Sequence, residues 1–317
     1  MPILNGLTAA LAWLGRQGTR ALAVSVFLGL ALPQLAVYVK PHLGEAVFVL
    51  LVFSYLRTEP AAFRSQLRAP GLVVLAAFWI MVVLPLLFGA LYAASGLPVG
   101  MPGLYTIMIL QLITTPITSS AAFAALLGLD VAFSLAALIM SNVLSPVTTV
   151  AFSYLFLGAS LFSPIDLGVR LFLLFAGAAV AAYLIRRIAG QAWIERQKQP
   201  LDGLNVIAVF VFAIAAMESV PRHVAADPVF ALELLGLIIV LTLAWIGLSV
   251  LAFWRAGFDR GLVIGLAAGF RNIGAMMAVL GATLPDVAWF FFALVQFPIF
   301  LFPWALQPLA RRFVKKR

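Results

Sequence analysis

The 317-residue sequence contains no cysteine, only two histidines and few charged residues, which make up 10% of the chain. Without cysteine, a disulfide, a thiolate nucleophile and a cysteine-ligated metal site are all excluded. His42 and His223 both fall in predicted loops, so neither a histidine metal site nor a catalytic histidine is expected. The chain also has no HExxH or GxSxG motif and no aspartate pair inside an apolar run, so we expect neither an enzyme nor a cofactor.

Apolar residues dominate instead, at 64% of the chain with a mean hydropathy of +1.13, whereas soluble domains are about 45–50% apolar. Runs of roughly 20 apolar residues recur along the whole length, and each is long enough to cross a bilayer as a helix. The N-terminus has no signal-peptide pattern, so we expect the first segments in the mature protein. These features predict an all-α polytopic membrane protein whose residues 1–317 form one transmembrane domain in the lipid bilayer.

Turn residues and charges divide the apolar runs into ten predicted transmembrane helices. They cover residues 20–39, 42–57, 70–95, 103–127, 130–158, 165–187, 203–220, 228–253, 261–283 and 286–310.

Positive charge alternates between the predicted connections. Sixteen of the twenty Lys and Arg fall in one set of connections, Lys40, Arg170 and Arg222 fall in the other, and Arg271 falls in neither. Lys and Arg accumulate on the cytoplasmic side, so we predict a multi-pass protein of the inner (cytoplasmic) membrane with both termini in the cytoplasm. The net charge of +9 is thereby explained by topology, and no nucleic-acid partner is expected; the C-terminal "RRFVKKR" can also contact lipid headgroups.

Three predicted spans carry polar or helix-breaking residues near mid-depth. The fourth contains Pro116 within "TTPITSS", the fifth contains Asn142 and Pro146, and the ninth contains Arg271 and Asn272. Proline removes a backbone donor, and hydroxyls nearby can bond the freed backbone groups. One interpretation is a set of kinked helices whose small residues pack against their neighbours.

The position of two of these spans favours a second interpretation. The fourth and ninth spans each take fourth place in a five-helix half of the chain, residues 20–158 and 165–310. Interrupted helices at corresponding positions indicate the substrate site of an inverted-repeat transporter.

Several motifs accompany these breaks. After Pro116 come "TSS", then the turn "DVAFS" from Asp130 to Ser134, then "SP" ending at Pro146; the ninth span adds "GFRNIG" around Arg271, and the connection "LRTEPAAFRSQLRAPG" precedes the third span. Together these motifs resemble the bile acid:sodium symporter family, as a bacterial homologue. The resemblance implies two inverted five-helix repeats, core and panel domains, broken helices that cross in spans 4 and 9, and organic-anion substrates.

The sodium ligands of that family do not carry over well to this sequence. The resemblance puts its glutamate on Ala267, its two glutamines on Arg271 and near Ile80, its asparagine on Ala121 and its threonine on Leu138. Only the hydroxyls of Ser120 and Ser134 are retained. No acidic residue lies between Arg260 and Pro285, so the missing carboxylate does not depend on the alignment.

Arg271 therefore stands where the family lodges sodium. Two unit charges about 4 Å apart repel by roughly 4 kcal/mol at an effective dielectric of 20, so no sodium ion is expected there. Our leading hypothesis is that Arg271, with Ser120 and Ser134, forms a surrogate of the cation site, in which the guanidinium bonds hydroxyls and backbone carbonyls of the crossing helices. Three alternatives are that it clamps a substrate carboxylate, that it snorkels to the interface, and that it merely ties two helices.

Polar residues around the two breaks are candidates for substrate binding. They are Thr115, Thr118, Ser119, Asn272 and Gln296. Half-helix N-termini at the breaks would present free N–H groups to an anion, although the same residues can simply satisfy the backbone at the breaks. We predict a secondary transporter of small organic anions that works by alternating access and is independent of sodium at the Arg271 site. Its energy coupling is left open between facilitated transport, proton-linked transport and sodium-linked transport through another site. The alternative is a channel-like or sensory membrane protein on the same fold; the oligomeric state is left open.

Overall fold

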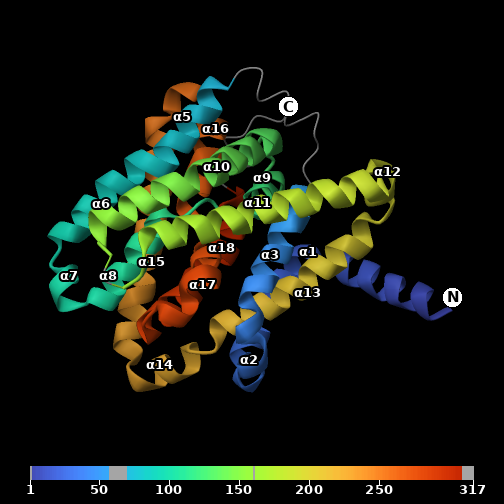
Figure 1. Cartoon of the computed structure of the whole chain (residues 1–317), viewed down its shortest axis with the longest axis horizontal. Helices are drawn as coiled ribbons and strands as arrows, with labels where there is room; N and C mark the ends of the chain where they lie inside the picture. Colours follow the sequence, from blue (N-terminus) through green and yellow to red (C-terminus); the bar gives the residue numbers. More distant parts are fainter. Residues whose placement is uncertain (1, 57–69, 160, 309–317) are drawn as a thin grey trace. The chain divides into compact units, whose positions relative to one another are not determined.

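The structure, a computed structural model, describes residues 2–56, 70–159 and 161–308 (Figure 1). Apart from one isolated bridge between Pro116 and Arg271, every regular element within those ranges is a helix. The "RRFVKKR" tail lies outside the described residues, as does most of the connection before the third span.

Several of these helices are long and apolar enough to cross a membrane. Six qualify within the described ranges: Gly71–Ala94, Val131–Phe156, Pro164–Ala189, Lys198–Ala226, Pro228–Ala252 and Asp286–Pro303. The chain is accordingly an all-α protein of the multi-pass membrane class. The count of ten spans and the inverted repeat stay predictions.

The chain divides into two compact units, each built from two separate stretches of sequence. Unit 1 comprises residues 1–57 and 173–226. Its helices are α1 (Pro2–Ala31), α2 (Pro33–Val39), η1 (Lys40–His42), α3 (Leu43–Leu56), the later part of α11 (Pro164–Ala189), α12 (Gln191–Arg196), α13 (Lys198–Met217) and α14 (Val220–Ala226).

Glycine lets two helices of unit 1 approach closely. A Cβ added to Gly203 of α13 would clash with the carbonyl oxygen of Leu11 on α1, and one added to Gly29 would lie 2.7 Å from the carbonyl oxygen of Ala213. Small residues at such contacts let helix backbones pack together in a membrane, where no hydrophobic force drives helices against one another.

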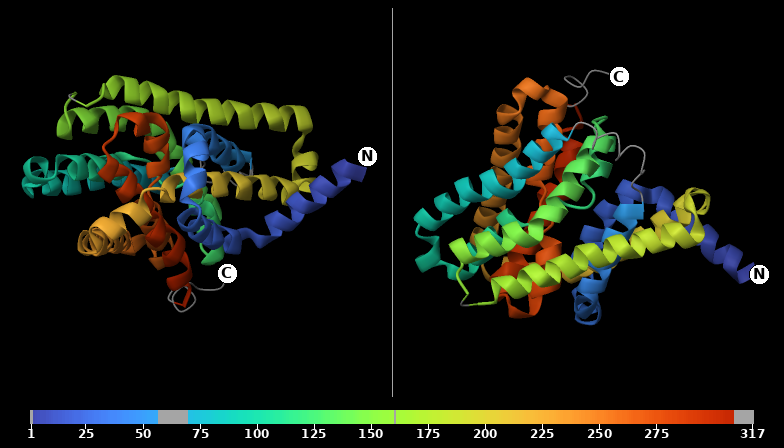
Figure 2. Two further views of the ribbon diagram at one scale, coloured as in Figure 1. Left: turned by 90° about the horizontal axis from the view of Figure 1, so that it is seen from below. Right: turned by 45° about the horizontal axis from the view of Figure 1, so that its top comes forward.

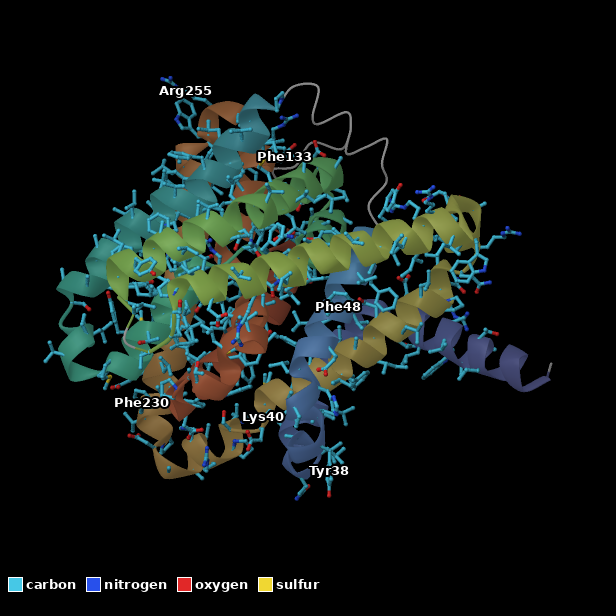
Figure 3. All side chains as sticks on the ribbon, viewed as in Figure 1. Tyr38, Lys40, Phe48, Phe133, Phe230 and Arg255 are labelled. Carbon is cyan, nitrogen blue, oxygen red and sulfur yellow. The ribbon has the colours of Figure 1, made fainter. Side chains whose placement is uncertain are left out.

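Polar contacts tie the helix ends of unit 1. The Lys40 ammonium donates to the Glu218 carboxylate at 2.7 Å, which joins η1 to the end of α13; Lys40 is labelled in Figure 3. At the other end, Arg186 donates to the carbonyl oxygens of Tyr55 and Leu56 at 3.2 and 2.9 Å. These carbonyls belong to the last turn of α3, which has no intrahelical donor for them.

The start of the chain differs from the sequence-based prediction. We expected one span over residues 20–39, but α1 begins at Pro2, ends at Ala31, and is followed by α2 from Pro33. The helix is interrupted at Leu32 because the residue before a proline is driven out of the helical region. The expected loop positions of His42 and His223 are also wrong, because His42 lies in η1 and His223 in α14.

Unit 2 comprises residues 58–172 and 227–317. Its helices are α5 (Gly71–Phe78), the π-helical turn η2 (Trp79–Val83), α6 (Leu84–Ala94), α7 (Leu97–Gly100), α8 (Pro102–Ile113), α9 (Ser120–Leu126), α10 (Val131–Phe156), the first part of α11, α15 (Pro228–Ala252), η3 (Trp254–Ala256), α16 (Phe258–Gly269), α17 (Ile273–Leu280), η4 (Gly281–Thr283) and α18 (Asp286–Ala305).

The polar fifth span is a continuous helix. α10 runs through Pro146 without a break. For this span, the interpretation as a kinked helix therefore fits better than the interpretation as an interrupted helix. The hydroxyls of its last turns take up backbone groups, since Thr148 Oγ1 donates to the carbonyl of Leu144 at 3.2 Å and Thr149 Oγ1 to that of Ile113 at 3.3 Å. Thr149 thereby satisfies a carbonyl at the end of α8.

A glycine seam joins α15 to α16. The two helices run antiparallel and follow one another through the short turn at 253–257 (Figure 2). A Cβ on Gly261 would meet Val250, one on Gly265 would lie 2.9 Å from the carbonyl oxygen of Ile246, and one on Gly269 would lie 2.7 Å from the Ile246 side chain. The seam holds α16 against α15 from Gly261 to Gly269, two residues before Arg271.

This seam gives a first prediction. Gly265→Val should destabilise the protein by about 1–3 kcal/mol, because the added methyl groups meet backbone that cannot move aside. Gly247→Val is the matched control, since Gly247 is on α15, faces outward and has nothing within 4 Å of its added Cβ. Thermal unfolding in detergent should show a lower midpoint for Gly265→Val alone; equal midpoints would contradict the packing.

Candidate functional site

Two interruptions in unit 2 meet each other. α8 ends at Ile113 and α9 begins at Ser120, while α16 ends at Gly269 and α17 begins at Ile273. The extended residues between them pair as a short antiparallel bridge. Ile117 N–H donates to the Phe270 carbonyl at 2.8 Å, and Asn272 N–H donates to the Thr115 carbonyl at 2.7 Å.

Local sequence explains why the helices stop here. Pro116 has no N–H and drives Thr115 toward extended backbone, and Thr114 is already extended at φ −79° and ψ 168°. Asn272 caps α17 by accepting the N–H of Ala275 on its side-chain oxygen at 3.3 Å, as N-cap asparagines do. The Thr114 hydroxyl donates to the Asn272 carbonyl at 3.1 Å, so backbone groups freed by the breaks find partners in each other.

Arg271 lies where these two interruptions meet, a place called the crossing below, and is 0% exposed. Its Nε donates to the Ala268 carbonyl at 2.7 Å, its Nη1 to the Thr114 carbonyl at 2.9 Å and its Nη2 to the Ile80 carbonyl at 3.0 Å. One side chain therefore joins three separate segments of unit 2: the end of α16, the end of α8 and the π-helical turn η2.

Each of the three carbonyls is free for a specific reason. Ala268 and Thr114 stand at helix ends, where the last carbonyls have no intrahelical donor. In η2 a carbonyl accepts from the N–H five residues later, as the Trp79 carbonyl does from Leu84. The Ile80 carbonyl would therefore need the N–H of residue 85, which is a proline and has none. The π-turn and Pro85 together leave the Ile80 carbonyl to the guanidinium.

An aromatic ring completes the environment of the charge. The Arg271 Cζ lies 5.7 Å from the centre of the Trp245 ring, and Trp245 is 2% exposed on α15. The ring of Phe88 meets Trp245 edge-on at 5.8 Å. Among the ion pairs of the described residues, none involves Arg271, so carbonyl dipoles and one π face solvate the cation.

This geometry separates the interpretations of Arg271. Snorkelling is wrong, because the side chain is fully buried and turned into the crossing. A carboxylate clamp is disfavoured, because all three guanidinium nitrogens already donate to protein carbonyls. The remaining two interpretations, a surrogate cation and a helix tie, predict the same contacts. The expected hydroxyls of Ser120 and Ser134, each 2% exposed, are not among the hydrogen-bond partners of Arg271.

The residues predicted for substrate binding fall into three groups. Thr115 and Asn272 meet at the crossing, where both are buried and where the Thr115 hydroxyl and the Asn272 Nδ2 have no hydrogen-bond partner. Thr118 and Ser119 are half-buried in the break before α9. Gln296 is buried on α18 with its Nε2 donating to the Phe292 carbonyl of its own helix at 3.1 Å; no hydrogen bond among the described residues joins it to the crossing.

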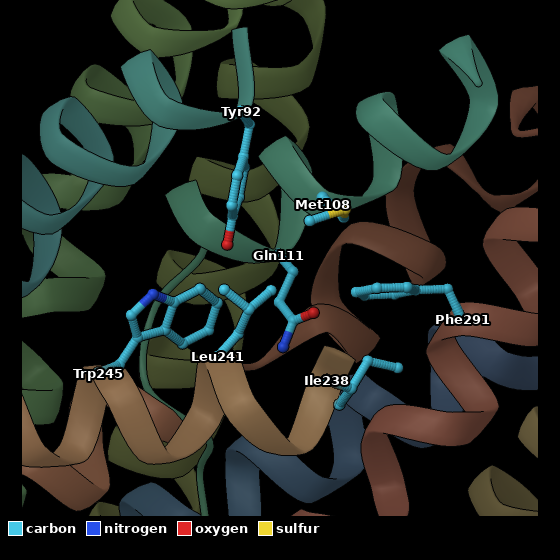
Figure 4. A pocket seen from close by; sticks show the side chains of 7 residues that line it. All are labelled: Tyr92, Met108, Gln111, Ile238, Leu241, Trp245 and Phe291. Atoms are coloured by element: carbon cyan, nitrogen blue, oxygen red, sulfur yellow. The ribbon is translucent and has the colours of Figure 1, made fainter. Parts of the chain in front are cut away.

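A second polar location in unit 2 was missed by the sequence analysis. Tyr92, Gln111 and Trp245 line one narrow cleft (Figure 4). Tyr92 and Gln111 could have been noticed as polar residues inside apolar runs. Nothing in the sequence relates them to Trp245, which is more than 130 positions further along the chain.

The fold and the crossing define a class, an all-α multi-pass membrane protein with a buried arginine where two interrupted helices meet. No protein-family model matches the chain, and no curated protein matches it.

A matched pair of threonines tests the crossing. Thr114→Val should lower the unfolding free energy by about 1 kcal/mol, because the Asn272 carbonyl loses a buried donor. Thr115→Val should leave stability nearly unchanged, because its hydroxyl has no partner to lose. Thermal unfolding in detergent measures the difference; if Thr115→Val were the more harmful of the two, the described hydrogen bonds would be wrong.

Proposed function

We propose that this protein is a secondary transporter of small organic anions that works by alternating access. In this proposal the fixed charge of Arg271 does the work that a sodium ion does in bile acid:sodium symporters, so transport is independent of sodium. The observation that carries the proposal is the burial of Arg271 on three backbone carbonyls at the meeting point of two helix breaks.

The ligands around Arg271 support the surrogate role. A sodium ion requires hard oxygen ligands, and backbone carbonyls are such ligands. The guanidinium presents N–H donors to three of them, and it keeps its charge because arginine does not deprotonate in proteins. A site already holding this charge repels a second cation.

The breaks themselves support a carrier architecture. We propose that α8 with α9, and α16 with α17, are the crossing helices of two inverted five-helix repeats within ten transmembrane spans. Each compact unit draws on both halves of the chain, which is what repeats intertwined into a panel (unit 1) and a core (unit 2) would require. The unpartnered polar atoms of Thr115 and Asn272 suit a site that binds a polar substrate at the crossing.

The first functional test replaces the charge. Arg271→Gln should reduce uptake of an anionic substrate into proteoliposomes by about ten- to a hundredfold, because a buried carbonyl left without its charged donor costs about 1.5–3 kcal/mol. Arg271→Lys keeps the charge and should retain measurable uptake. Wild-type uptake should be equal in sodium and in potassium.

The controls for this test separate transport from folding. Arg170→Gln removes an arginine that is 57% exposed and pairs with Asp166 on its own helix, and it should transport like the wild type. Substrate counterflow, which a channel cannot perform, identifies a carrier. Strong dependence of wild-type uptake on sodium, or unchanged uptake by Arg271→Gln, contradicts the proposal.

The second functional test reverses the replacement. The double variant Ala267→Glu with Arg271→Gln restores the carboxylate and the glutamine that the resemblance puts at these two positions. Sodium should then raise its thermal midpoint relative to potassium, because a ligand that binds only the folded state stabilises it. Sodium should leave the wild type and Arg271→Gln alone unaffected; a sodium effect in the wild type counts against the surrogate charge.

A further inference from the structure

The charge of Arg271 is solvated but not neutralised. Its partners are carbonyl dipoles and the face of Trp245, and no carboxylate of the described residues pairs with it. An uncompensated cation in a low-dielectric interior attracts a negative charge over several ångströms.

A cleft with hydrogen-bond donors lies beside this charge. Tyr92 of α6, Gln111 of α8 and Trp245 of α15 line this narrow cleft. Figure 4 shows the Tyr92 hydroxyl and the Gln111 amide both reaching into the space. These three residues are 4%, 2% and 2% exposed.

Two of these polar groups lack a hydrogen-bond partner. The Tyr92 hydroxyl and the Trp245 Nε1 are both buried without one. Leaving a buried polar group unbonded is costly, so these two groups need a partner, such as a water or an ion, that the protein itself does not supply. Trp245 also connects the cleft to the charge, since the guanidinium lies over its ring.

We propose that this cleft is a binding site for a small monovalent anion, of the size of a halide or formate, which acts as the counter-ion of Arg271. The Tyr92 hydroxyl and the Gln111 amide N–H groups are its hydrogen-bond donors. The site is independent of transport and separate from the hydroxyl-rich crossing.

Charge selects this class of guest. The cleft has no acidic side chain among its lining residues, and the nearby guanidinium repels a cation. The other walls are Met108, Ile238, Leu241 and Phe291, which bind an ion weakly and exclude bulk water. The cleft opens no water-sized space by itself, so the flexible stem of Gln111 must turn to admit an ion. A bulky organic anion does not fit.

The test measures anion binding by the purified full-length protein in detergent. Thermal midpoints are recorded in potassium chloride, bromide, formate and gluconate at one ionic strength, with gluconate as the anion too large for the cleft. The wild type should be stabilised saturably by chloride and bromide relative to gluconate. Retention of radioactive chloride gives the affinity directly.

Conservative variants locate the site. Tyr92→Phe and Gln111→Leu should each weaken chloride binding about tenfold or more, the effect of losing one hydrogen bond to an ion. Tyr105→Phe is the matched control, because the Tyr105 hydroxyl donates to the Phe156 carbonyl at 3.0 Å and does not line the cleft; it should bind like the wild type.

The remaining outcomes decide the proposal. If formate competes with chloride and depends on the same two variants, the site takes small monovalent anions from either an inorganic or a carboxylate source, as proposed. If chloride alone binds, the inorganic ion is the counter-ion. No saturable anion effect in the wild type, or equal binding by Tyr92→Phe, Gln111→Leu and Tyr105→Phe, overturns the site and leaves the transport proposal standing.

Discussion

A permanently charged side chain is buried in a bilayer-spanning bundle, and the protein itself must take the place of water around it. Insertion of an arginine at the membrane centre costs about 2.5–3.5 kcal/mol even on the most lenient scales. Arg271 meets this constraint with one hydrogen bond from each of its three nitrogens to backbone carbonyls. Those carbonyls are free to accept only because the regular helices are interrupted around Arg271.

The interruptions and the arginine consequently depend on each other. Pro116 stops α8, and Pro85 leaves a carbonyl free after a π-turn. Without a donor these groups would be unsatisfied in an apolar environment. Without these groups the guanidinium would have no solvation. The glycine seam on α16 brings Arg271 to the position where the guanidinium gains its solvation and the free carbonyls gain a donor. The Thr114 hydroxyl adds a hydrogen bond across the crossing.

The sequence was sufficient for some features and insufficient for others, for physical reasons. Length and hydropathy predicted the all-α membrane class, and Arg271 was noticeable as a charge inside an apolar run. Its partners could not be predicted, because backbone carbonyls have no sequence signature. The Ile80 carbonyl is free because of a π-turn, and the only sign of that turn in the sequence is Pro85.

The extension of α1 back to Pro2 was missed because residues 2–19 are less apolar than a membrane span. Hydropathy does not detect a helix that continues beyond the membrane span. The continuity of α10 was open because proline permits a kink as well as a break.

The same buried charge connects the proposed function with the proposed anion site. In the proposed function the fixed cation takes the place of a coupling ion at the crossing. In the proposed anion site the same cation attracts a negative partner, which Tyr92 and Gln111 would hold. The most direct measurement is an experimental structure of the full-length protein in high sodium, at a resolution that shows the guanidinium. The account predicts Arg271 on the carbonyls of Ile80, Thr114 and Ala268 with no metal ion beside it. A guanidinium turned away from these carbonyls, or a sodium ion coordinated by them, would contradict it.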